Sequence, residues 1–167
     1  DLDVAQLTAR LTEGRPGYLR RRILPEDANR IHQLGEPALE FPRETERFYP
    51  QGAMAAHVLG FVGADGNGHV GMEQVFDQRL TDPLTRGTPA ALSLDTRVQG
   101  ALEDELLRGM AESNAKGAAG IVLDVDTGEI LALASLPSFN PNLISRANEG
   151  YIFNRVTNQV YELGSTF

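Results

Sequence analysis

The stretch "GAAGIVLDVDTGEILALAS" at residues 117–135 places the tightest constraint on what this chain can fold into. Two apolar runs flank Asp126, Thr127 and Gly128, and glycine most readily takes the positive φ of a tight hairpin turn. The stretch therefore predicts an antiparallel hairpin. The residues that follow, "LPSFNPN", contain two prolines and lead the chain out of the sheet.

A long helix is predicted immediately before the hairpin, over residues 96–113. Its apolar positions recur at helical spacing and form one stripe: Val98, Leu102, Leu106 and Met110. Asp95 is a suitable N-cap, and "AALSL" at residues 90–94 predicts one further strand. A hairpin with one more strand and one helix forms a thin sheet with open edges. We therefore expect more chain, or a partner, to complete it.

Shorter elements are predicted toward the N-terminus. Asp3 is a suitable N-cap for a first helix, and Pro25 stands in the first turn of a second. Three prolines within residues 37–50 favour extended segments or edge strands. A further helical pattern ends at Gly60, a turn cluster follows, and residues 72–80 predict another helix.

The stretch "TDPLTRGTP" is the best linker candidate, and it places a domain boundary near Pro89. The predicted fold class is α+β. Residues 1–89 are expected to form a small domain of short helices and strands. Residues 90–167 are expected to form an incomplete α+β subdomain with the hairpin, one further strand and the long helix.

Composition excludes several classes of function. The net charge of -8 and a pI near 4.8 argue against a nucleic-acid binder, although Arg20, Arg21 and Arg22 form a local basic run. That run is either a solvated face or a contact for an acidic partner or phospholipid headgroups. The chain has no cysteine, which excludes disulfides, zinc-thiolate sites and cysteine nucleophiles. No apolar run approaches the ~20 residues that span a bilayer.

The histidines and acidic turns do not predict a metal site. His32, His57 and His69 lack metal-ligand spacing, so each is interpreted as a structural histidine. Asp65 and Asn67 in "DGNG" lack the remaining oxygen ligands of a calcium loop. We expect neither a metal nor a cofactor.

The chain closes on "GSTF", in which Ser165 opens a familiar pattern. A serine followed three positions later by a lysine is the nucleophile motif of penicillin-recognising enzymes, and here that lysine would be residue 168. Considered alone, Ser165 is better interpreted as an ordinary helix N-cap without chemistry, and the sequence blocks that precede it in the chain reverse that interpretation. The missing lysine, the absent initiator methionine and the thin sheet lead us to expect a piece of a longer protein.

Five blocks share one resemblance in the same order. They are "RFYPQGAMAAHVLGFVG", "GHVGMEQVFDQRL", "LSLDTRVQ", "GIVLDVDTGEILALASLPSFNPN" and "NRVTNQVYELGSTF". Together they resemble the class B penicillin-binding proteins, and most closely the division-specific (septal) peptidoglycan transpeptidases. The resemblance runs in register from about Phe41 to Phe167.

The resemblance implies that Ser165 is the acyl-ester nucleophile of a D,D-transpeptidase that crosslinks peptidoglycan stem peptides and is acylated by β-lactams. The base lysine and the later serine-x-asparagine and lysine-threonine-glycine motifs lie outside the 167 residues. We therefore expect this polypeptide alone to be inactive.

The resemblance also implies a non-catalytic pedestal at residues 1–89. Seven residues match its motif positions: Arg47, Gly52, His57, Gly60, Gly71, Glu73 and Asp77. Arginine-carboxylate pairing is expected to lock the pedestal blocks together, and His57 is expected to form a hydrogen bond within the fold. Ordinary surface charge is the alternative for the charged residues.

Several alternatives remain open. The chain could act as a scaffold module that contacts other cell-division proteins, and elongation-type transpeptidases share the general plan. A β-lactam sensor or β-lactamase is disfavoured by the pedestal blocks. The family implies a location on the periplasmic face of the bacterial inner membrane at the division septum. Membrane contact is expected only through an N-terminal anchor outside this chain, and no nucleic acid is expected as a partner.

Overall fold

The structure is a computed structural model, and it describes residues 3–14, 16–20, 23–42, 46–144, 146–162 and 164. The chain divides into two compact units, Asp1–Glu44 and Thr45–Phe167. Ser165 lies outside the described residues, as do Arg21 and Arg22 of the basic run.

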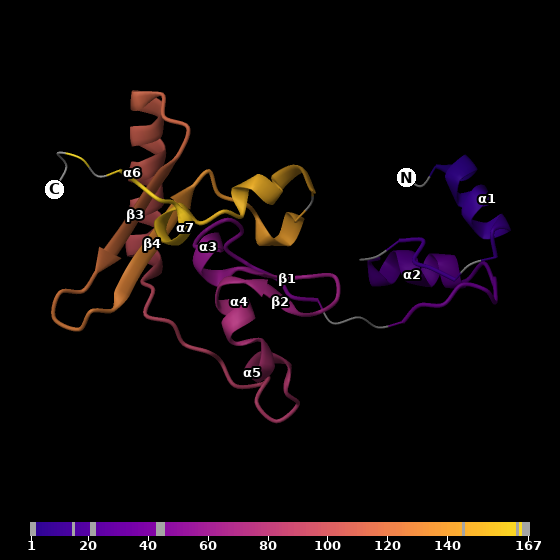
Figure 1. The fold of residues 1–167 in the computed structure, drawn as a ribbon. Helices are drawn as coiled ribbons and strands as arrows, with labels where there is room; N and C mark the ends of the chain where they lie inside the picture. Colours follow the sequence, from indigo (N-terminus) through magenta and orange to yellow (C-terminus); the bar gives the residue numbers. More distant parts are fainter. Residues whose placement is uncertain are drawn as a thin grey trace. The chain divides into compact units, whose positions relative to one another are not determined.

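The first unit contains two short helices, α1 (Val4–Thr12) and α2 (Pro25–His32) (Figure 1). Asp3 caps α1 as predicted, because its carboxylate accepts a hydrogen bond from the Ala5 amide at 2.9 Å. Pro25 begins α2, where its missing N–H costs nothing. Neither helix contains a buried residue, so this unit rests on local helix signals rather than on a core.

The second unit is mixed helix and strand, as the predicted α+β class requires (Figure 1). Its elements, in chain order, are α3 (Ala56–Leu59), β1 (Phe61–Val62), β2 (Gly68–Val70), α4 (Gly71–Val75), α5 (Asp77–Thr81), α6 (Thr96–Ser113), β3 (Ala118–Leu123), β4 (Ile130–Leu136), η1 (Pro141–Leu143), η2 (Arg146–Tyr151) and α7 (Arg155–Asn158). The strands form two separate antiparallel pairs, β1 with β2 and β3 with β4.

The predicted hairpin is confirmed as β3 and β4. Its ladder runs from Ala118 opposite Leu136 to the turn, with a register shift next to Leu123. The Asp124 carboxylate accepts hydrogen bonds from the amides of Asp126 and Thr127, both at 2.9 Å, and so organises the turn. Gly128 has a φ of 76°, which is the conformation expected of it.

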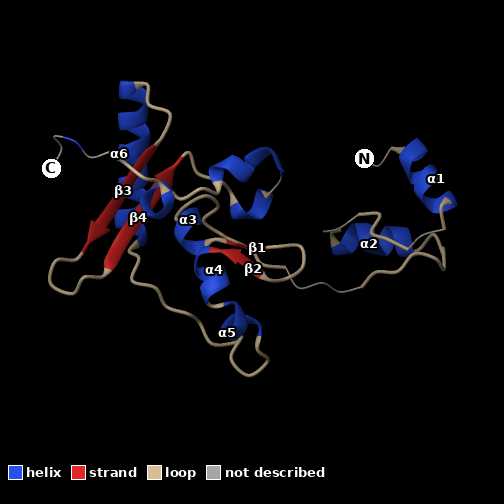
Figure 2. Ribbon diagram, in the orientation of Figure 1, coloured by secondary structure: helices blue, strands red, loops and turns tan. Residues whose placement is uncertain are grey.

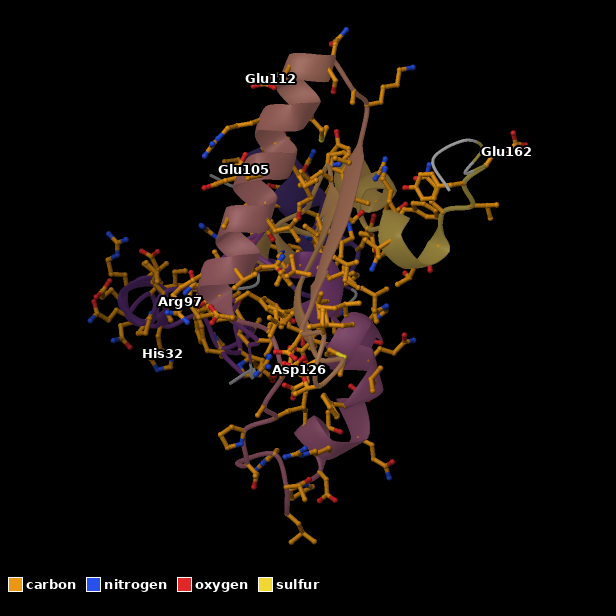
Figure 3. The ribbon with its side chains drawn as sticks, turned by 90° about the vertical axis from the view of Figure 1, so that its left-hand side faces the viewer. His32, Arg97, Glu105, Glu112, Asp126 and Glu162 are labelled. Atoms are coloured by element: carbon orange, nitrogen blue, oxygen red, sulfur yellow. The ribbon has the colours of Figure 1, made fainter. Side chains whose placement is uncertain are left out.

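The predicted long helix is confirmed as α6, which packs against both strands of the hairpin (Figure 2). Asp95 caps it by accepting from the amides of Arg97 and Val98. A Cβ on Gly120 would lie 3.0 Å from Leu102, so glycine admits the close approach of helix and strand. Figure 3 shows Glu105 and Glu112 on the side of α6 away from the hairpin.

The strand predicted at residues 90–94 is wrong: no strand is assigned there. That segment reaches β4 only through single bonds, from the Ser93 hydroxyl to the Ile130 carbonyl at 2.7 Å and from the Asp95 amide to the Leu131 carbonyl at 2.9 Å. The next pair of β4 backbone groups, on Leu133, is bound by the side chain of Gln99. Side chains thus occupy the edge that a strand ladder would need.

Residues 46–81 differ in detail from the prediction. The helix expected to end at Gly60 is short, and the turn cluster after it contains the two-strand pair β1–β2, which was not predicted. The helix expected over 72–80 divides into α4 and α5 at Phe76, whose φ of -98° and ψ of 9° lie outside the helical range. No strand is assigned within residues 37–42 or 46–50.

The core joins residues from both sides of the predicted boundary at Pro89. Tyr49, Ala56, Phe61 and Phe139 form a buried cluster, with Val70, Ile144 and Ile152 packed against it. Pro89 lies inside the second compact unit, whereas the two units divide after Glu44. The division into functional domains 1–89 and 90–167 stays a prediction.

Candidate functional site

The described residues lead toward Ser165 through a short, tethered segment. The Asn154 side chain accepts a hydrogen bond from the Val156 amide at 3.0 Å and caps the start of α7. Beyond α7 the chain is extended at Gln159, and Gly164 takes a φ of 51°. The geometry of the Ser165 hydroxyl lies outside the described residues.

His57 contacts this segment from α3. Its Nε2 lies 2.7 Å from the Tyr151 carbonyl oxygen, so the ring donates a proton there, and its ring meets Phe139 edge-on at 5.1 Å between centroids. Burial lowers the pKa of His57 and outweighs the opposing effect of the Tyr151 bond. The charge of Arg155 lowers it further, whereas Glu103 raises it. The neutral imidazole is therefore the favoured form.

Arg47 and Glu73 form the ion pair that ties residues 46–50 to α4. The Arg47 Nε lies 2.6 Å from a Glu73 carboxylate oxygen, and the side chain of Glu73 is 7% exposed against 53% for Arg47. Burial alone lowers the pKa of Arg47, but the hydrogen bond and the charge of Glu73 outweigh it, so the pKa is raised. A nearly buried carboxylate thus has one half-exposed cationic partner.

Tyr49 lies beside this pair and is itself buried. Burial and the charge of Glu73 raise the pKa of Tyr49 to about 12. Its hydroxyl accepts a hydrogen bond from the Val62 amide at 3.0 Å, and the Arg47 guanidinium lies 5.9 Å from its ring centroid. Tyr49 therefore links strand β1 to the ion pair.

Two of the predicted glycines allow backbone segments to meet. Gly60 has a φ of 80°, and a Cβ on it would lie 1.7 Å from the Val70 carbonyl oxygen. Gly71 has a φ of 64°, and a Cβ on it would lie 2.6 Å from the Val58 carbonyl oxygen. No other residue type fits this crossing without moving the backbone. Gly52, the third, adopts a positive φ in the turn before α3.

Asp77 fixes the other end of β2. One of its carboxylate oxygens accepts a hydrogen bond from the Gly68 amide at 2.7 Å. This bond falls where α4 ends and α5 begins. The structure therefore brings Arg47, Glu73 and Asp77 into one tethered unit with β1 and β2. His57 instead contacts, from α3, the segment that leads to Ser165.

Three side chains with a central structural part were not identified from the sequence. The Gln99 carboxamide accepts from the Leu133 amide at 2.9 Å and donates to the Leu133 carbonyl at 3.0 Å. Glu103 accepts from Gln99 and from the amide of Ala55. The Asn142 carboxamide binds both backbone groups of Tyr49, at 2.9 and 2.8 Å. Their only sequence signal is a polar residue within a helical face or a loop.

Glu103 stabilises an unusual backbone conformation at Ala55. Ala55 has a φ of 54°, a left-handed conformation that costs a non-glycine residue roughly 1–2 kcal/mol. Its amide donates to Glu103 at 2.8 Å, which stabilises the strained turn at the start of α3. The network therefore joins α6 to residues 53–56.

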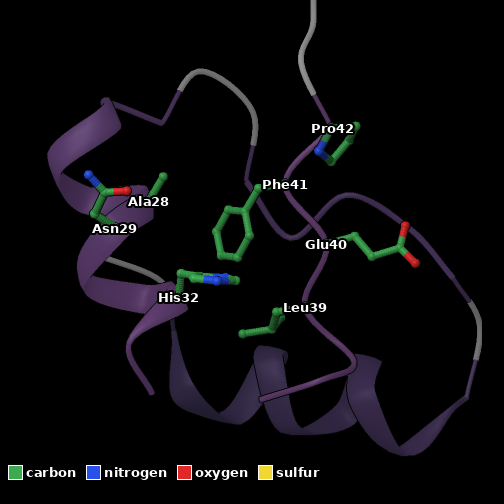
Figure 4. A pocket seen from close by; sticks show the side chains of 7 residues that line it. All are labelled: Ala28, Asn29, His32, Leu39, Glu40, Phe41 and Pro42. Atoms are coloured by element: carbon green, nitrogen blue, oxygen red, sulfur yellow. The ribbon is translucent and has the colours of Figure 1, made fainter. Parts of the chain in front are cut away.

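Each unit contains an open pocket lined by described residues. The first, of about 570 Å³, is bounded by α2 and the segment after it, where His32 meets Phe41 edge-on (Figure 4). The second, of about 400 Å³, has an apolar floor that includes Met72, Phe76 and Leu92, with Arg47 and Arg86 among its lining residues. His57 lines neither pocket.

Neither a metal-binding cluster nor a membrane-spanning helix occurs in the part of the chain that the structure describes. Within it, no three histidine, cysteine, aspartate or glutamate side chains gather closely enough to hold a metal ion. Nor does any described helix combine the length and the apolar character needed to cross a membrane.

The family model for the penicillin binding protein transpeptidase domain matches residues 118–167, from the first residue of β3 to the end of the chain. The chain is 43% identical over 150 residues to a probable peptidoglycan D,D-transpeptidase, FtsI, of Caulobacter vibrioides, covering 87% of this chain and 25% of that protein. It is 34% identical over 191 residues to the Escherichia coli FtsI transpeptidase, covering 99% of this chain and 32% of that protein.

A solved structure shares part of the fold. Penicillin binding protein 3 of Mycobacterium tuberculosis matches with a TM-score of 0.51 and 29% identity, over 59% of this chain and 24% of that one. That protein has also been solved in complexes with aztreonam and with ampicillin. The chain spans about a quarter to a third of the length of the curated relatives it matches. Residues 118–167 therefore match the penicillin binding protein transpeptidase domain, and the chain as a whole is similar to part of the FtsI peptidoglycan D,D-transpeptidases.

Proposed function

We propose that this chain is part of a septal peptidoglycan D,D-transpeptidase in which Ser165 is the acyl-ester nucleophile. The observation that carries the proposal is the transpeptidase-domain match, which runs from the β3–β4 hairpin through Ser165. The named relatives are D,D-transpeptidases over an alignment that covers most of this chain, which supports the same chemistry.

The proposed reaction proceeds through two acyl transfers. The Ser165 oxygen attacks the carbonyl of the penultimate D-alanine of a stem peptide and gives up its proton to a neighbouring base. The bond to the terminal D-alanine breaks, and that D-alanine leaves as an amine that takes a proton. An amine of a second stem then attacks the ester, forms the crosslinking amide and releases the serine, which regains its proton.

The base is proposed to be a lysine at the third position after Ser165. On a helix, residues three apart lie on the same face, so the lysine side chain, in its neutral amine form, can accept the serine proton. A serine at a helix N-terminus also lies near backbone N–H groups, which stabilise the developing oxyanion. A β-lactam carbonyl is proposed to be attacked in the same way and to leave a stable acyl-enzyme.

A scaffold function for residues 1–89 is the second candidate. It is favoured by the hydrogen bonds that join residues 46–89 to residues 90–144, from Tyr49 to Asn142 and from Ala55 to Glu103. A segment joined in this way can hold a catalytic subdomain in place while it contacts other cell-division proteins. The proposed location is the periplasmic face of the inner membrane at the septum, reached through an upstream anchor.

The direct test is covalent labelling of the full-length gene product that contains this chain with a fluorescent penicillin. We expect one label per molecule, and we expect the Ser165→Ala variant to lose it. The control is Ser113→Ala, at the exposed end of α6, which should label as the wild type does. An unlabelled wild-type protein would favour the scaffold candidate. Label retained by Ser165→Ala would place the nucleophile elsewhere.

A further inference from the structure

We propose that Ser135 and His57 are positioning residues for the nucleophile, because they hold from two sides the segment 151–155 that leads to Ser165. The inference rests on the proposed function, in which Ser165 is acylated. It assigns no contact with substrate to either residue. Their role is to fix where α7 starts, and through α7 the path of the chain toward the nucleophile.

The tethering bonds fall on alternate residues of the segment. The Tyr151 carbonyl accepts from His57 at 2.7 Å, the Phe153 carbonyl accepts from the Ser135 hydroxyl at 3.4 Å, and the Arg155 amide donates to that same hydroxyl at 3.0 Å. One serine hydroxyl therefore uses its donor and an acceptor lone pair on two backbone groups. Ser135 is 1% exposed, so no water replaces these bonds readily.

The side chain of Arg155 adds a third restraint. A Cβ on Gly117 would lie 2.6 Å from the Arg155 Nε and 3.0 Å from the Leu136 carbonyl oxygen. The guanidinium therefore passes directly over the entry to β3, where only glycine leaves room. Since α7 contacts both β3 and β4, its first turn is fixed to the hairpin by backbone bonds and by this close approach.

The two tethers come from different parts of the chain. Ser135 lies on β4, inside the region that matches the transpeptidase-domain model, whereas His57 lies on α3, in the region predicted to be non-catalytic. His57 is held there by Phe139 and by the strained turn at Ala55 that Glu103 stabilises. The approach to the nucleophile is thus fixed jointly by the catalytic subdomain and by its support.

Ser165 follows Arg155 by ten positions in the sequence, so an error in the start of α7 propagates to the nucleophile. A misplacement of about 1 Å in a reacting group lowers a rate by up to ~100-fold. It leaves the non-covalent binding of the ligand largely intact, since binding uses other contacts. Loss of a tether should therefore slow acylation at saturating ligand more than it weakens binding.

The test measures acylation of the full-length protein by nitrocefin as a function of concentration, which separates the limiting acylation rate from the half-saturating concentration. For Ser135→Ala we expect the limiting rate to fall about tenfold. The half-saturating concentration should change less than twofold, and complete acylation should still be reached after long incubation. His57→Phe should behave alike, and His57→Gln, which keeps a donor, should recover part of the rate.

The matched control is Ser138→Ala. That serine lies three positions along the chain, and its hydroxyl donates to the Ala53 carbonyl at 3.3 Å rather than to segment 151–155. Its acylation rate should equal that of the wild type. The inference is overturned if Ser135→Ala and His57→Phe keep the wild-type limiting rate. It is also overturned if their rates fall only in proportion to the fraction of protein molecules that are folded and can be acylated at all. If the wild type is not acylated, the proposed function fails, and this inference fails with it.

Discussion

The β3–β4 hairpin with α6 and the segment from residue 46 to residue 81 are held together by different means. In the hairpin, the stabilising contacts are distributed over many residues, through a continuous backbone ladder and the packing of α6. In residues 46–81, the strands are two and three residues long, and single side chains bond to single backbone groups. A fold held by few contacts should be far more sensitive to single substitutions than one held by a ladder.

Gly60→Ala should show this contrast most strongly. A Cβ at Gly60 would overlap the Val70 carbonyl at 1.7 Å, in a backbone conformation that already disfavours alanine. We expect the free energy of unfolding to fall by about 4 kcal/mol or more. A denaturant titration should therefore show that the cooperative unfolding transition is lost. Gly128→Ala is the control in the hairpin. It also has a positive φ, of 76°, but no atom lies within 4 Å of its Cβ, so the loss should be about 1 kcal/mol. Equal losses would contradict the comparison.

Arg47→Met should have the next largest effect. It leaves the Glu73 carboxylate, 7% exposed, without its cationic partner, and we expect a loss of roughly 2–3 kcal/mol, reduced because Arg47 is itself half exposed. Arg108→Met is the matched control on α6, because Arg108 and Glu105 pair at 2.9 Å with both side chains about two-thirds exposed. Its loss should stay below about 1 kcal/mol. The argument fails if the two variants unfold at the same denaturant concentration.

Gln99→Leu tests a place where a side chain replaces a ladder at the β4 edge of the hairpin. The substitution leaves the amide and carbonyl of Leu133 without the partners that Gln99 supplies, and we expect a loss of about 2 kcal/mol. Amide hydrogen exchange at Leu133 should quicken relative to that at Val122, which lies opposite Ala132 in a hydrogen-bonded pair of the ladder. Unchanged protection of the Leu133 amide would show that the hydrogen bonds from the Gln99 side chain contribute little to stability.

Acidification should destabilise the junction at His57. Because burial lowers its pKa in the fold below the ordinary 6.5, the unfolded chain binds a proton more readily than the folded one. The stabilising contribution is complete above about pH 6.5 and is lost as pH falls from there through the folded pKa. Arg155, which lowers this pKa, and Glu103, which raises it, are the charged groups that act on the ring.

The measurement is the free energy of unfolding between pH 7 and pH 5 for the wild type and for His57→Gln. The variant should show a smaller decrease than the wild type over this interval. Parallel curves would indicate that His57 does not titrate differently in the fold.

The sequence predicted the elements that local rules determine. The hairpin followed from two apolar runs around Gly128, and α6 followed from its stripe and from the cap at Asp95, because each signal lies within one element. The strand at 90–94 was predicted from the same kind of apolar run. It failed because the neighbouring edge of β4 is occupied by the Gln99 side chain and by an isolated hydrogen bond from Ser93, not by a strand ladder. Only tertiary structure decides which partner an edge takes.

The candidate site divides in the same way. The seven pedestal positions and Ser165 were found through resemblance, which transfers positions without geometry. The roles of Gln99, Glu103 and Asn142 were missed, because each depends on a backbone group 34 to 93 positions away in the chain. Ser135 gave no sequence signal either, since a serine in an apolar strand indicates neither a tether nor its target.

The central claim is that Ser165 is acylated, and mapping the adduct tests it most directly. The full-length protein would be treated with benzylpenicillin and digested with trypsin, and the modified peptide identified by mass spectrometry. The account predicts a penicilloyl adduct on the peptide that begins at Val156, after cleavage at Arg155, with the modification on Ser165. An adduct on another residue, or an unmodified Ser165 in a folded protein, would contradict it.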